Sequence, residues 1–294
     1  MRIAITGASG QLGMATLREL AARVSALDIV AITRRPDKLE QFSARGITVR
    51  AGDFNDPAGL EKAFEGIERL LIIPGSDLQP DVRPRQHRAA IDAAVAAGVR
   101  HIIYVSTVGA RPGKSDGIFE THFATEQALI GSGAEWTLLR MSVYADMLID
   151  SAKRAIDSGT YAALAGAPAA YIVRDDLAAA AAGLLATNGH EGITYHATGP
   201  APLTAAQFAE IVSAISGKRV TFVPITIEQL EAGLTAAGLP SAVVKVISRF
   251  QAALRDGAFD LLTGDVERLA GRRPEPVESF LGRRLQSGTQ QVHA

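Results

Sequence analysis

Three glycines follow the first apolar run of the chain, and this feature constrains the fold most strongly. The segment "MRIAITGASGQLG" places Gly7, Gly10 and Gly13 between a strand-like stretch and a helical pattern. A strand, a glycine-rich turn and a helix in this order are typical of a dinucleotide-binding turn. There the first glycine allows a tight bend, the second lets the backbone approach a pyrophosphate, and the third lets the helix pack closely on the strand. A purely structural turn is the alternative, but strand, spacing and helix together favour a nucleotide site.

Short apolar runs alternate with helical patterns through the first half of the 294-residue chain. This alternation predicts βαβ units and a parallel sheet, and the nearly continuous apolar runs indicate strands covered by helices on both faces. The expected strands span residues 3–6, 29–33, 48–50, 70–73, 101–106 and 137–140. The predicted fold class is therefore α/β, with a doubly wound parallel sheet and a smaller C-terminal α/β lobe.

The alternation weakens after about residue 141, where short strands, helices and proline turns follow one another. We expect residues 1–150 to form a dinucleotide-binding domain and residues 151–294 to form mainly a substrate-binding lobe. The helical pattern near residues 175–186 is expected to return to the main domain.

The balance of charge and the absence of cysteine narrow the function. Lys and Arg number 30 and Asp and Glu 31, so neither nucleic acid nor an anionic membrane is the expected partner. Without cysteine there are no disulfides, and no metal-binding motif occurs. We see no leader sequence or apolar stretch that could span a membrane, and we expect a cytoplasmic protein that binds a small molecule, with a homo-oligomer left open.

The end of the second expected strand indicates which dinucleotide is bound. NAD sites usually place Asp or Glu there to hold a ribose hydroxyl, whereas arginine accommodates a 2′-phosphate. Here the strand ends "AITRRP", with Arg34 and Arg35 and no acid. We therefore predict that NADP(H) is preferred over NAD(H). The alternative is that both arginines are ordinary solvated surface charges.

Several motifs together resemble the short-chain dehydrogenase/reductase superfamily. They are the TGxxGxxG turn, "GDFND" at residues 52–56, "LLIIPG", "RHIIYVSTVGA" and "HFATEQALIGSGAEWTLLRMSVYADML". The last is most similar to the atypical NmrA-like branch, which includes NAD(P)H quinone oxidoreductases and triphenylmethane reductases. The resemblance implies a Rossmann-type fold. With the strand ends, it places the cofactor-binding residues at Thr6, Gly7, Ser9, Gly10, Gln11, Leu12, Gly13, Arg34, Arg35, Asp53, Phe54, Ile73, Pro74, Ser106 and Thr107.

The chain departs from this superfamily where most active members carry a Tyr and, four residues later, a Lys. The corresponding stretch "FETHFATEQAL" offers His122 and Glu126 instead. This disfavours carbinol oxidation, epimerisation and dehydration, which need a matched proton donor. Quinone reduction has a weaker requirement for a proton donor, because the reduced oxygen has a conjugate acid of pKa about 10. Water or His122 could therefore protonate it. His122 and Glu126 could instead be a pair that only stabilises a helix.

Residues that follow the fourth, fifth and sixth strands are expected beside the substrate, because ligands of open α/β sheets bind beyond the carboxyl ends of the strands. The candidates for substrate binding are Gly75, His122, Met141 and Tyr144. Tyr144 could equally fill the core, and the hydroxyls of Ser106 and Thr107 could only satisfy local backbone groups.

These features predict an NADPH-dependent reductase that transfers hydride to a quinone or a related conjugated acceptor, with His122 as the candidate catalytic residue. The resemblance leaves open a second function, since the NmrA-like branch also includes regulators that bind the dinucleotide as a redox signal without turnover.

Overall fold

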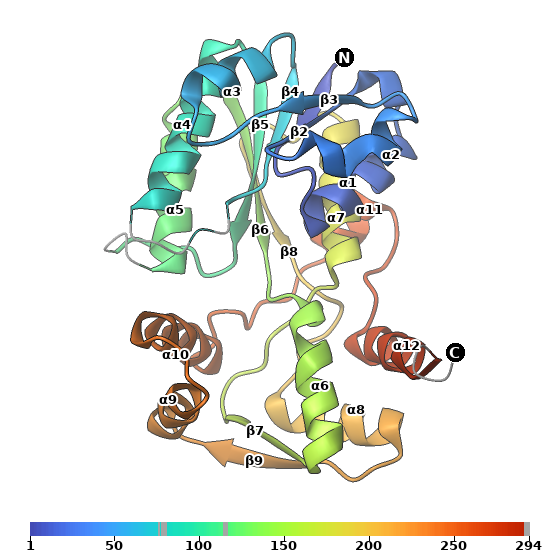
Figure 1. Ribbon diagram of the computed structural model, residues 1–294, viewed down its shortest axis with the longest axis vertical. Helices are drawn as coiled ribbons and strands as arrows, with labels where there is room; N and C mark the ends of the chain where they lie inside the picture. Colours follow the sequence, from blue (N-terminus) through green and yellow to red (C-terminus); the bar gives the residue numbers. More distant parts are fainter. Residues whose placement is uncertain (76, 78–80, 114–116, 291–294) are drawn as a thin grey trace. The chain divides into compact units, whose positions relative to one another are not determined.

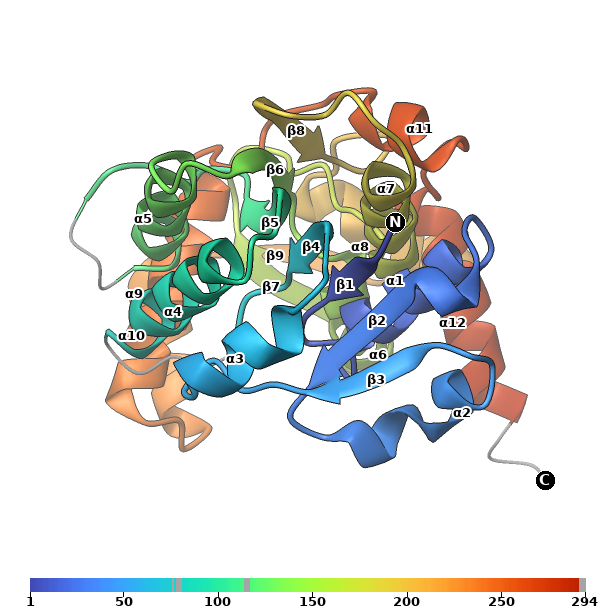
Figure 2. The ribbon, with the colours of Figure 1, turned by 90° about the horizontal axis from the view of Figure 1, so that it is seen from above.

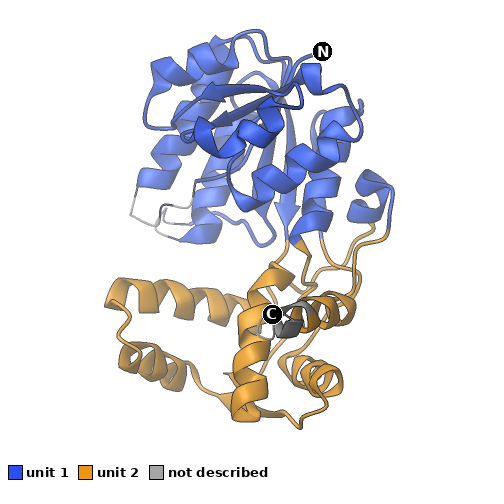
Figure 3. Cartoon of the chain, turned by 45° about the vertical axis from the view of Figure 1, so that its right-hand side comes forward, with its two compact units in different colours: residues 1–141, 174–197, 265–272 blue, residues 142–173, 198–264, 273–294 orange. Residues whose placement is uncertain are grey.

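A computed structural model describes residues 1–75, 77, 81–113 and 117–290 of the chain. Two compact units, here called the first and second unit, share the chain (Figure 3). The first unit comprises residues 1–141, 174–197 and 265–272, and the second comprises residues 142–173, 198–264 and 273 onward. The chain therefore passes between the units several times.

The first unit is built around a parallel sheet with the strand order β3-β2-β1-β4-β5-β6-β8 (Figure 1). The order reverses between β1 and β4, so the helices that follow these two strands lie on opposite faces and leave a crevice at the carboxyl ends. The strands are β1 (Ile3–Ile5), β2 (Ile29–Thr33), β3 (Thr48–Ala51), β4 (Arg69–Ile72), β5 (His101–Thr107), β6 (Glu135–Met141) and β8 (Ile193–Ala197).

Helices cover both faces of this sheet (Figure 2). Helices α3, α4 and α5 lie on one face, and α1, α7 and α11 lie on the other. The bounds are α1 (Gln11–Ala21), η1 (Ala26–Asp28), η2 (Pro36–Leu39), α2 (Glu40–Ser43), α3 (Pro57–Phe64), α4 (Val82–Ala96), α5 (Ile118–Ile130), α7 (Arg174–Ala186) and α11 (Asp265–Ala270). The predicted doubly wound α/β fold is confirmed.

Small residues allow the layers of the first unit to pack closely. Helix α7 is buried along nearly its whole length, and its alanines let it lie against α1 and α11. A Cβ at Gly183 would collide with the carbonyl of Leu269, so this helix pair depends on glycine. On the other face, Phe64 and Tyr104 are fully buried between α3, α4, α5 and the sheet.

The second unit has its own core and a small parallel sheet of β7 (Thr160–Leu164) and β9 (Thr221–Ile225). Phe208, Val212 and Phe280 lie in that core. Its helices are η3 (Ala145–Met147), α6 (Leu148–Ser158), α8 (Ala205–Ser216), α9 (Ile227–Ala236), α10 (Ser241–Arg255) and α12 (Val277–Gln290).

Candidate functional site

The glycine-rich turn joins β1 to α1 at the carboxyl edge of the sheet. Gly7 has a φ of +61°, in the left-handed region that favours glycine. A Cβ at Gly10 would lie 3.1 Å from the Gly7 carbonyl oxygen, and a Cβ at Gly13 would lie 2.7 Å from Cα of Ala8. The turn thus has the conformation and the bare backbone surface that the spacing predicts, and it fits the pyrophosphate of a dinucleotide.

The first turn of α1 offers backbone donors to a ligand. Gly10 is the N-cap residue and supplies no side-chain cap, and the first hydrogen bond of the helix runs from Met14 N to Gly10 O. The N–H groups of Gln11, Leu12 and Gly13 therefore have no acceptor within the helix. Together with the positive end of the helix dipole, they form a site suited to phosphate.

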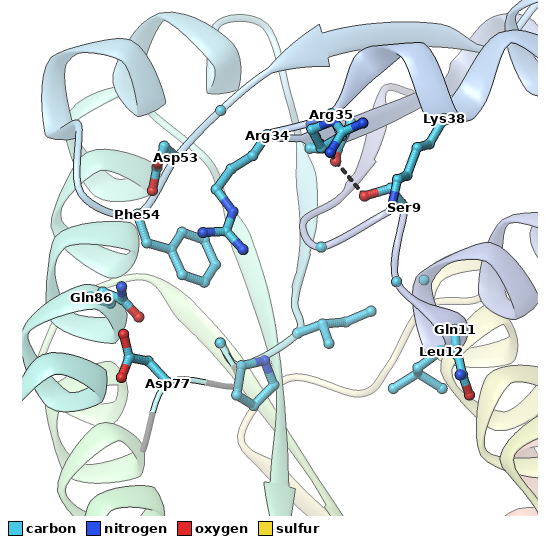
Figure 4. A pocket seen from close by; sticks show the side chains of 18 of the residues that line it. Ser9, Gln11, Leu12, Arg34, Arg35, Lys38, Asp53, Phe54, Asp77 and Gln86 are labelled. Atoms are coloured by element: carbon cyan, nitrogen blue, oxygen red, sulfur yellow. Dashed lines mark hydrogen bonds between the residues drawn. The ribbon is translucent and has the colours of Figure 1, made fainter. Parts of the chain in front are cut away.

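A cleft of about 660 Å³ lies beside this turn (Figure 4). Its wall brings together thirteen of the predicted residues, which are Gly7, Ser9, Gly10, Gln11, Leu12, Gly13, Arg34, Arg35, Asp53, Phe54, Ile73, Pro74 and Gly75. Six further residues line it that were not among the predicted site residues, namely Thr33, Lys38, Gly52, Asn55, Asp77 and Gln86. Gly52 and Asn55 do lie in the segment 52–56 that carries part of the family resemblance.

Three cations stand at the end of β2, and their surroundings differ. Arg34 reaches across the cleft toward Phe54 (Figure 4). Arg35 instead donates from Nε and Nη2 to the carboxylate of Asp37, at 3.1 and 3.0 Å. Within the described part of the chain, the side chains of Arg34 and Lys38 have no ion pair or hydrogen bond. Arg34 and Lys38 are therefore the cations best able to bind an anionic ligand group.

Hydrogen bonds hold the remaining walls of the cleft. Ser9 Oγ lies 2.6 Å from Thr33 Oγ1, which ties the glycine turn to the end of β2. On the opposite wall the Asp53 carboxylate accepts from the backbone and side-chain nitrogens of Asn55, and Gln86 donates to Asn55 Oδ1. Asp53 and Phe54 are thus presented by a rigid turn after β3.

Three predicted cofactor residues lie outside the lining of the cleft. The buried Thr6 hydroxyl donates to Leu71 O and accepts from Ile73 N, so it joins β1 to the turn after β4. Ser106 donates to Glu126 Oε1 at 2.5 Å, and Thr107 donates to the carbonyl of Val108 at 3.1 Å. Their predicted contacts with the cofactor stay predictions.

His122 lies in a buried polar cluster between α4, α5 and β5. Its Nε2 is 3.2 Å from Arg83 Nη2, and its Nδ1 is 2.9 Å from the Tyr104 hydroxyl. Because guanidinium only donates, Nε2 must accept and the proton of the neutral imidazole sits on Nδ1. Burial, and then the charge of Arg83, keep the pKa of His122 well below its usual range. The ring is therefore neutral, and its Nδ1–H donates a hydrogen bond to the Tyr104 hydroxyl.

Glu126 has a different partner from the one a simple helical pair would give it. Arg140 of β6 donates to both of its carboxylate oxygens, at 2.8 and 2.6 Å, and Glu126 is fully buried. Strand register places Ser106 directly beside Arg140. The resulting Ser106, Glu126 and Arg140 cluster joins α5 to the carboxyl ends of β5 and β6.

The two remaining substrate candidates lie in different units. Met141 ends β6 in the first unit and is half-buried. Tyr144 lies in the second unit, where it precedes η3 and forms an isolated parallel β-bridge with Ile172. Their role in substrate binding stays a prediction.

Neither a membrane span nor a metal centre is found in the described ranges. No helix there is long and apolar enough to cross a membrane. No group of three or more His, Asp or Glu side chains is placed to hold a metal ion.

A doubly wound sheet with a phosphate-binding turn and a cleft at its switch point defines a dinucleotide-binding protein. Residues 7–188 match the model of a family described as NAD(P)H-binding. The chain is 39% identical to quinone oxidoreductase 2 of Escherichia coli over 260 residues, which cover 88% of this chain and 90% of that one. It belongs to the NAD(P)H-binding family, in the NmrA-like branch of the atypical short-chain dehydrogenases/reductases.

Solved structures agree with this assignment. The NADPH complex of the Escherichia coli quinone oxidoreductase superposes with a TM-score of 0.91 at 35% identity, covering 96% of this chain and 99% of that one. The NADP(H) complex of the triphenylmethane reductase from a Citrobacter species gives 0.88 at 33% identity, with the same coverages of 96% and 99%. These relatives are oxidoreductases and support an oxidoreductase here.

Proposed function

We propose that this chain is an NADPH-dependent reductase that transfers hydride to a quinone or a related conjugated acceptor. A phosphate-binding turn and two cations, Arg34 and Lys38, line the same cleft. Neither cation has a carboxylate partner among the described residues, and the proposal rests on this observation. The named activities of the relatives, quinone oxidoreductase and triphenylmethane reductase, support the same class of reaction.

The cleft residues divide the work of holding NADPH. The N–H groups at the start of α1 bind the pyrophosphate, while Arg34 and Lys38 bind the 2′-phosphate by charge-assisted hydrogen bonds. Asp53 and Phe54 hold the adenine side, and Ile73, Pro74 and Gly75 wall the cleft after β4. NADPH supplies the hydride when bound, and these residues fix its position.

The proton requirement is mild, which agrees with the surroundings of His122. Reduction of a quinone to a hydroquinone takes up one hydride and one proton, and the phenolate-type oxygen that accepts this proton has a conjugate acid with a pKa of about 10, like tyrosine. Water can therefore protonate the product at neutral pH. Because the Nδ1–H of His122 is directed to Tyr104, we assign catalysis chiefly to the positioning of hydride donor and acceptor.

A panel of acceptors tests this function. Purified protein is mixed with NADPH and, in turn, with benzoquinones, naphthoquinones and a triphenylmethane dye, and loss of NADPH absorbance is followed. The proposal predicts saturable NADPH oxidation with at least one quinone. Tight NADPH binding with no oxidation by any acceptor would instead indicate a redox-sensing binding protein.

A further inference from the structure

One wall of the nucleotide cleft contains a chain of side-chain hydrogen bonds that joins α4 to the turn after β3. Figure 4 shows Asp53, Phe54 and Gln86 on the same side of the cleft. Gln86 Nε2 lies 3.2 Å from Asn55 Oδ1, and Asn55 Nδ2 lies 3.1 Å from Asp53 Oδ1. The backbone N–H of Asn55 donates to the same Asp53 oxygen at 3.0 Å. Residues of α4 and of the β3 turn are therefore linked through Asn55.

The chemistry of these groups fixes the direction of the chain. A carboxylate only accepts, so Asn55 must turn its Nδ2 toward Asp53. The Oδ1 of Asn55 is then left for Gln86, and because this oxygen also only accepts, Gln86 must present Nε2. The Oε1 of Gln86 lies next to the turn after β4, where a Cβ at Gly75 would be 2.9 Å from it. Each amide thus has one orientation that is compatible with its neighbours.

Burial differs along the chain, and this difference gives Gln86 its effect. Gln86 is only 7% exposed and is held by α4, which packs against α3 and α5. Asn55 is exposed, and Asp53 is half-buried. An exposed amide that lacked a partner on the protein would turn freely in water. The hydrogen bond from Gln86 therefore fixes Asn55, and Asn55 in turn fixes the carboxylate of Asp53.

The wall that results offers oxygens that only accept hydrogen bonds. Asp53 Oδ2 and Gln86 Oε1 make no hydrogen bond or ion pair with any residue that the structure describes. Neither atom is among the fully enclosed polar atoms, so both are accessible. The ring of Phe54, which packs against the core behind it, lies beside them. This wall suits a flat ring that carries an N–H donor and disfavours one that carries an oxygen in the same place.

We propose that Gln86 is a positioning residue that acts through Asn55. It holds the Asp53 carboxylate toward the amino group of adenine and so sets the preference of the cleft for a 6-amino over a 6-oxo purine. The inference rests on the proposed function in one respect, which is that the adenine side of NADPH lies beside Asp53 and Phe54.

Two dinucleotides that differ at one position of the base isolate this effect. Reduced nicotinamide hypoxanthine dinucleotide phosphate has an oxygen where NADPH has the 6-amino group, and its phosphates and nicotinamide are the same. Titration of the full chain without acceptor is expected to show NADPH binding about ten- to hundredfold more tightly, the range of one hydrogen bond to a charged group. Equal affinities, or no binding of NADPH, would overturn the inference.

Protein variants separate positioning from direct contact. Gln86→Met keeps nearly the length and volume of the side chain but removes the donor, and it is expected to reduce the preference for NADPH about three- to tenfold. Asp53→Ala should reduce the preference at least as much, and Gln86→Met should add nothing in the Asp53→Ala background. Gln127→Met changes an exposed glutamine of α5 and is the matched control, which should leave the preference unchanged.

Asn55→Ala breaks the same link at an exposed position, so it tests the inference even if Gln86→Met fails to fold. It is expected to reduce the preference for NADPH to the same extent as Gln86→Met. If a folded Gln86→Met or Asn55→Ala variant weakens both dinucleotides equally, the chain of hydrogen bonds only supports the wall and the inference is wrong. A further loss of preference from Gln86→Met in the Asp53→Ala background would show direct contact with the base and would also refute positioning.

These titrations need no turnover, which separates the inference from the proposed function. A parent protein that shows the expected preference but oxidises no NADPH with the acceptor panel would refute the reductase function and leave the role of Gln86 standing. A parent protein that reduces a quinone but binds both dinucleotides equally would refute the role of Gln86 alone.

Discussion

Arg35, which lines the cleft, forms a two-point ion pair with Asp37, with donor–acceptor distances of 3.1 and 3.0 Å. Both side chains are more than half exposed, so the pair contributes little to stability. We expect this pair to affect recognition instead, because Asp37 would compete with a ligand phosphate for the guanidinium of Arg35. The two arginines that look equivalent in the sequence therefore differ in the fold.

This difference gives a prediction for cofactor choice. Arg34→Ala and Lys38→Ala should each weaken NADPH binding by about one decade or more, since a charge-assisted hydrogen bond contributes about 1.5–3 kcal/mol and the site is partly screened. Arg35→Ala should weaken it less. Titrations of each variant with NADPH and with NADH check this, and NADH serves as the control because it lacks the 2′-phosphate. If NADPH and NADH binding weaken equally, these side chains support the folding of the turn and do not bind the 2′-phosphate.

The glycine turn separates a binding defect from a folding defect. Gly10 has a φ of −76°, which any residue adopts, and a Cβ there would make one tight contact of 3.1 Å with the Gly7 carbonyl oxygen. Gly10→Val should therefore lower stability only modestly, leave the protein folded and abolish NADPH binding by occupying the place of the pyrophosphate. Gly13→Val should instead destabilise the fold, because its side chain would enter the backbone of Gly7 and Ala8. Thermal unfolding and NADPH titration distinguish the two variants. Unchanged NADPH affinity in folded Gly10→Val would make the turn purely structural.

Local sequence patterns were sufficient for the sheet but not for every wall of the cleft. Strands β1 to β6 could be predicted within two residues of their observed ends, since each is a short apolar run between turns or helices. Lys38 was missed because it reaches the cleft only through the short helix η2. The sequence signal that could have identified Lys38 was its position three residues after Arg35.

The surroundings of His122 were beyond prediction for a related reason. Arg83, Tyr104 and His122 come from α4, β5 and α5, and only their packing brings the side chains together. Glu126 similarly forms an ion pair with Arg140 of β6 and not with His122, its neighbour on α5. Spacing along one helix identifies candidates but does not choose among partners from other elements.

His122 is expected to have a modest effect on turnover. His122→Ala should lower kcat less than tenfold, because the ring is neutral and its proton is directed to Tyr104 rather than to an acceptor. An essential general acid typically contributes a hundredfold or more. Steady-state kinetics with saturating NADPH measures the effect, and His122→Gln is the control that retains a hydrogen-bonding side chain. A fall to the uncatalysed rate with NADPH binding intact would make His122 the essential acid.

Buried His87 makes stability depend on pH. Burial, and then the nearby Arg83 charge, lower the pKa of His87 to about 3, against about 6.5 in the unfolded chain. Between these values the unfolded chain binds a proton that the folded chain does not. The free energy of unfolding should therefore fall as the pH drops below about 6.5, by up to roughly 1.4 kcal/mol per pH unit from this group.

Denaturant unfolding at several pH values between those two pKa values checks this contribution. His87→Gln removes the titrating ring, so its stability should decline less steeply with falling pH than that of the parent. Because carboxylates titrate in both proteins, only the difference between the two curves is assigned to His87. Parallel curves would contradict a neutral, buried ring at this position.

A single turnover tests the central claim most directly. Protein saturated with NADPH is mixed anaerobically with excess 1,4-benzoquinone, and the loss of NADPH absorbance is compared with a protein-free reaction and with Gly10→Val. The account predicts that the parent accelerates the loss of one NADPH per chain and that Gly10→Val matches the protein-free rate. If NADPH binds the parent tightly yet disappears at the protein-free rate with this quinone and with the rest of the acceptor panel, the chain is not a reductase of this class.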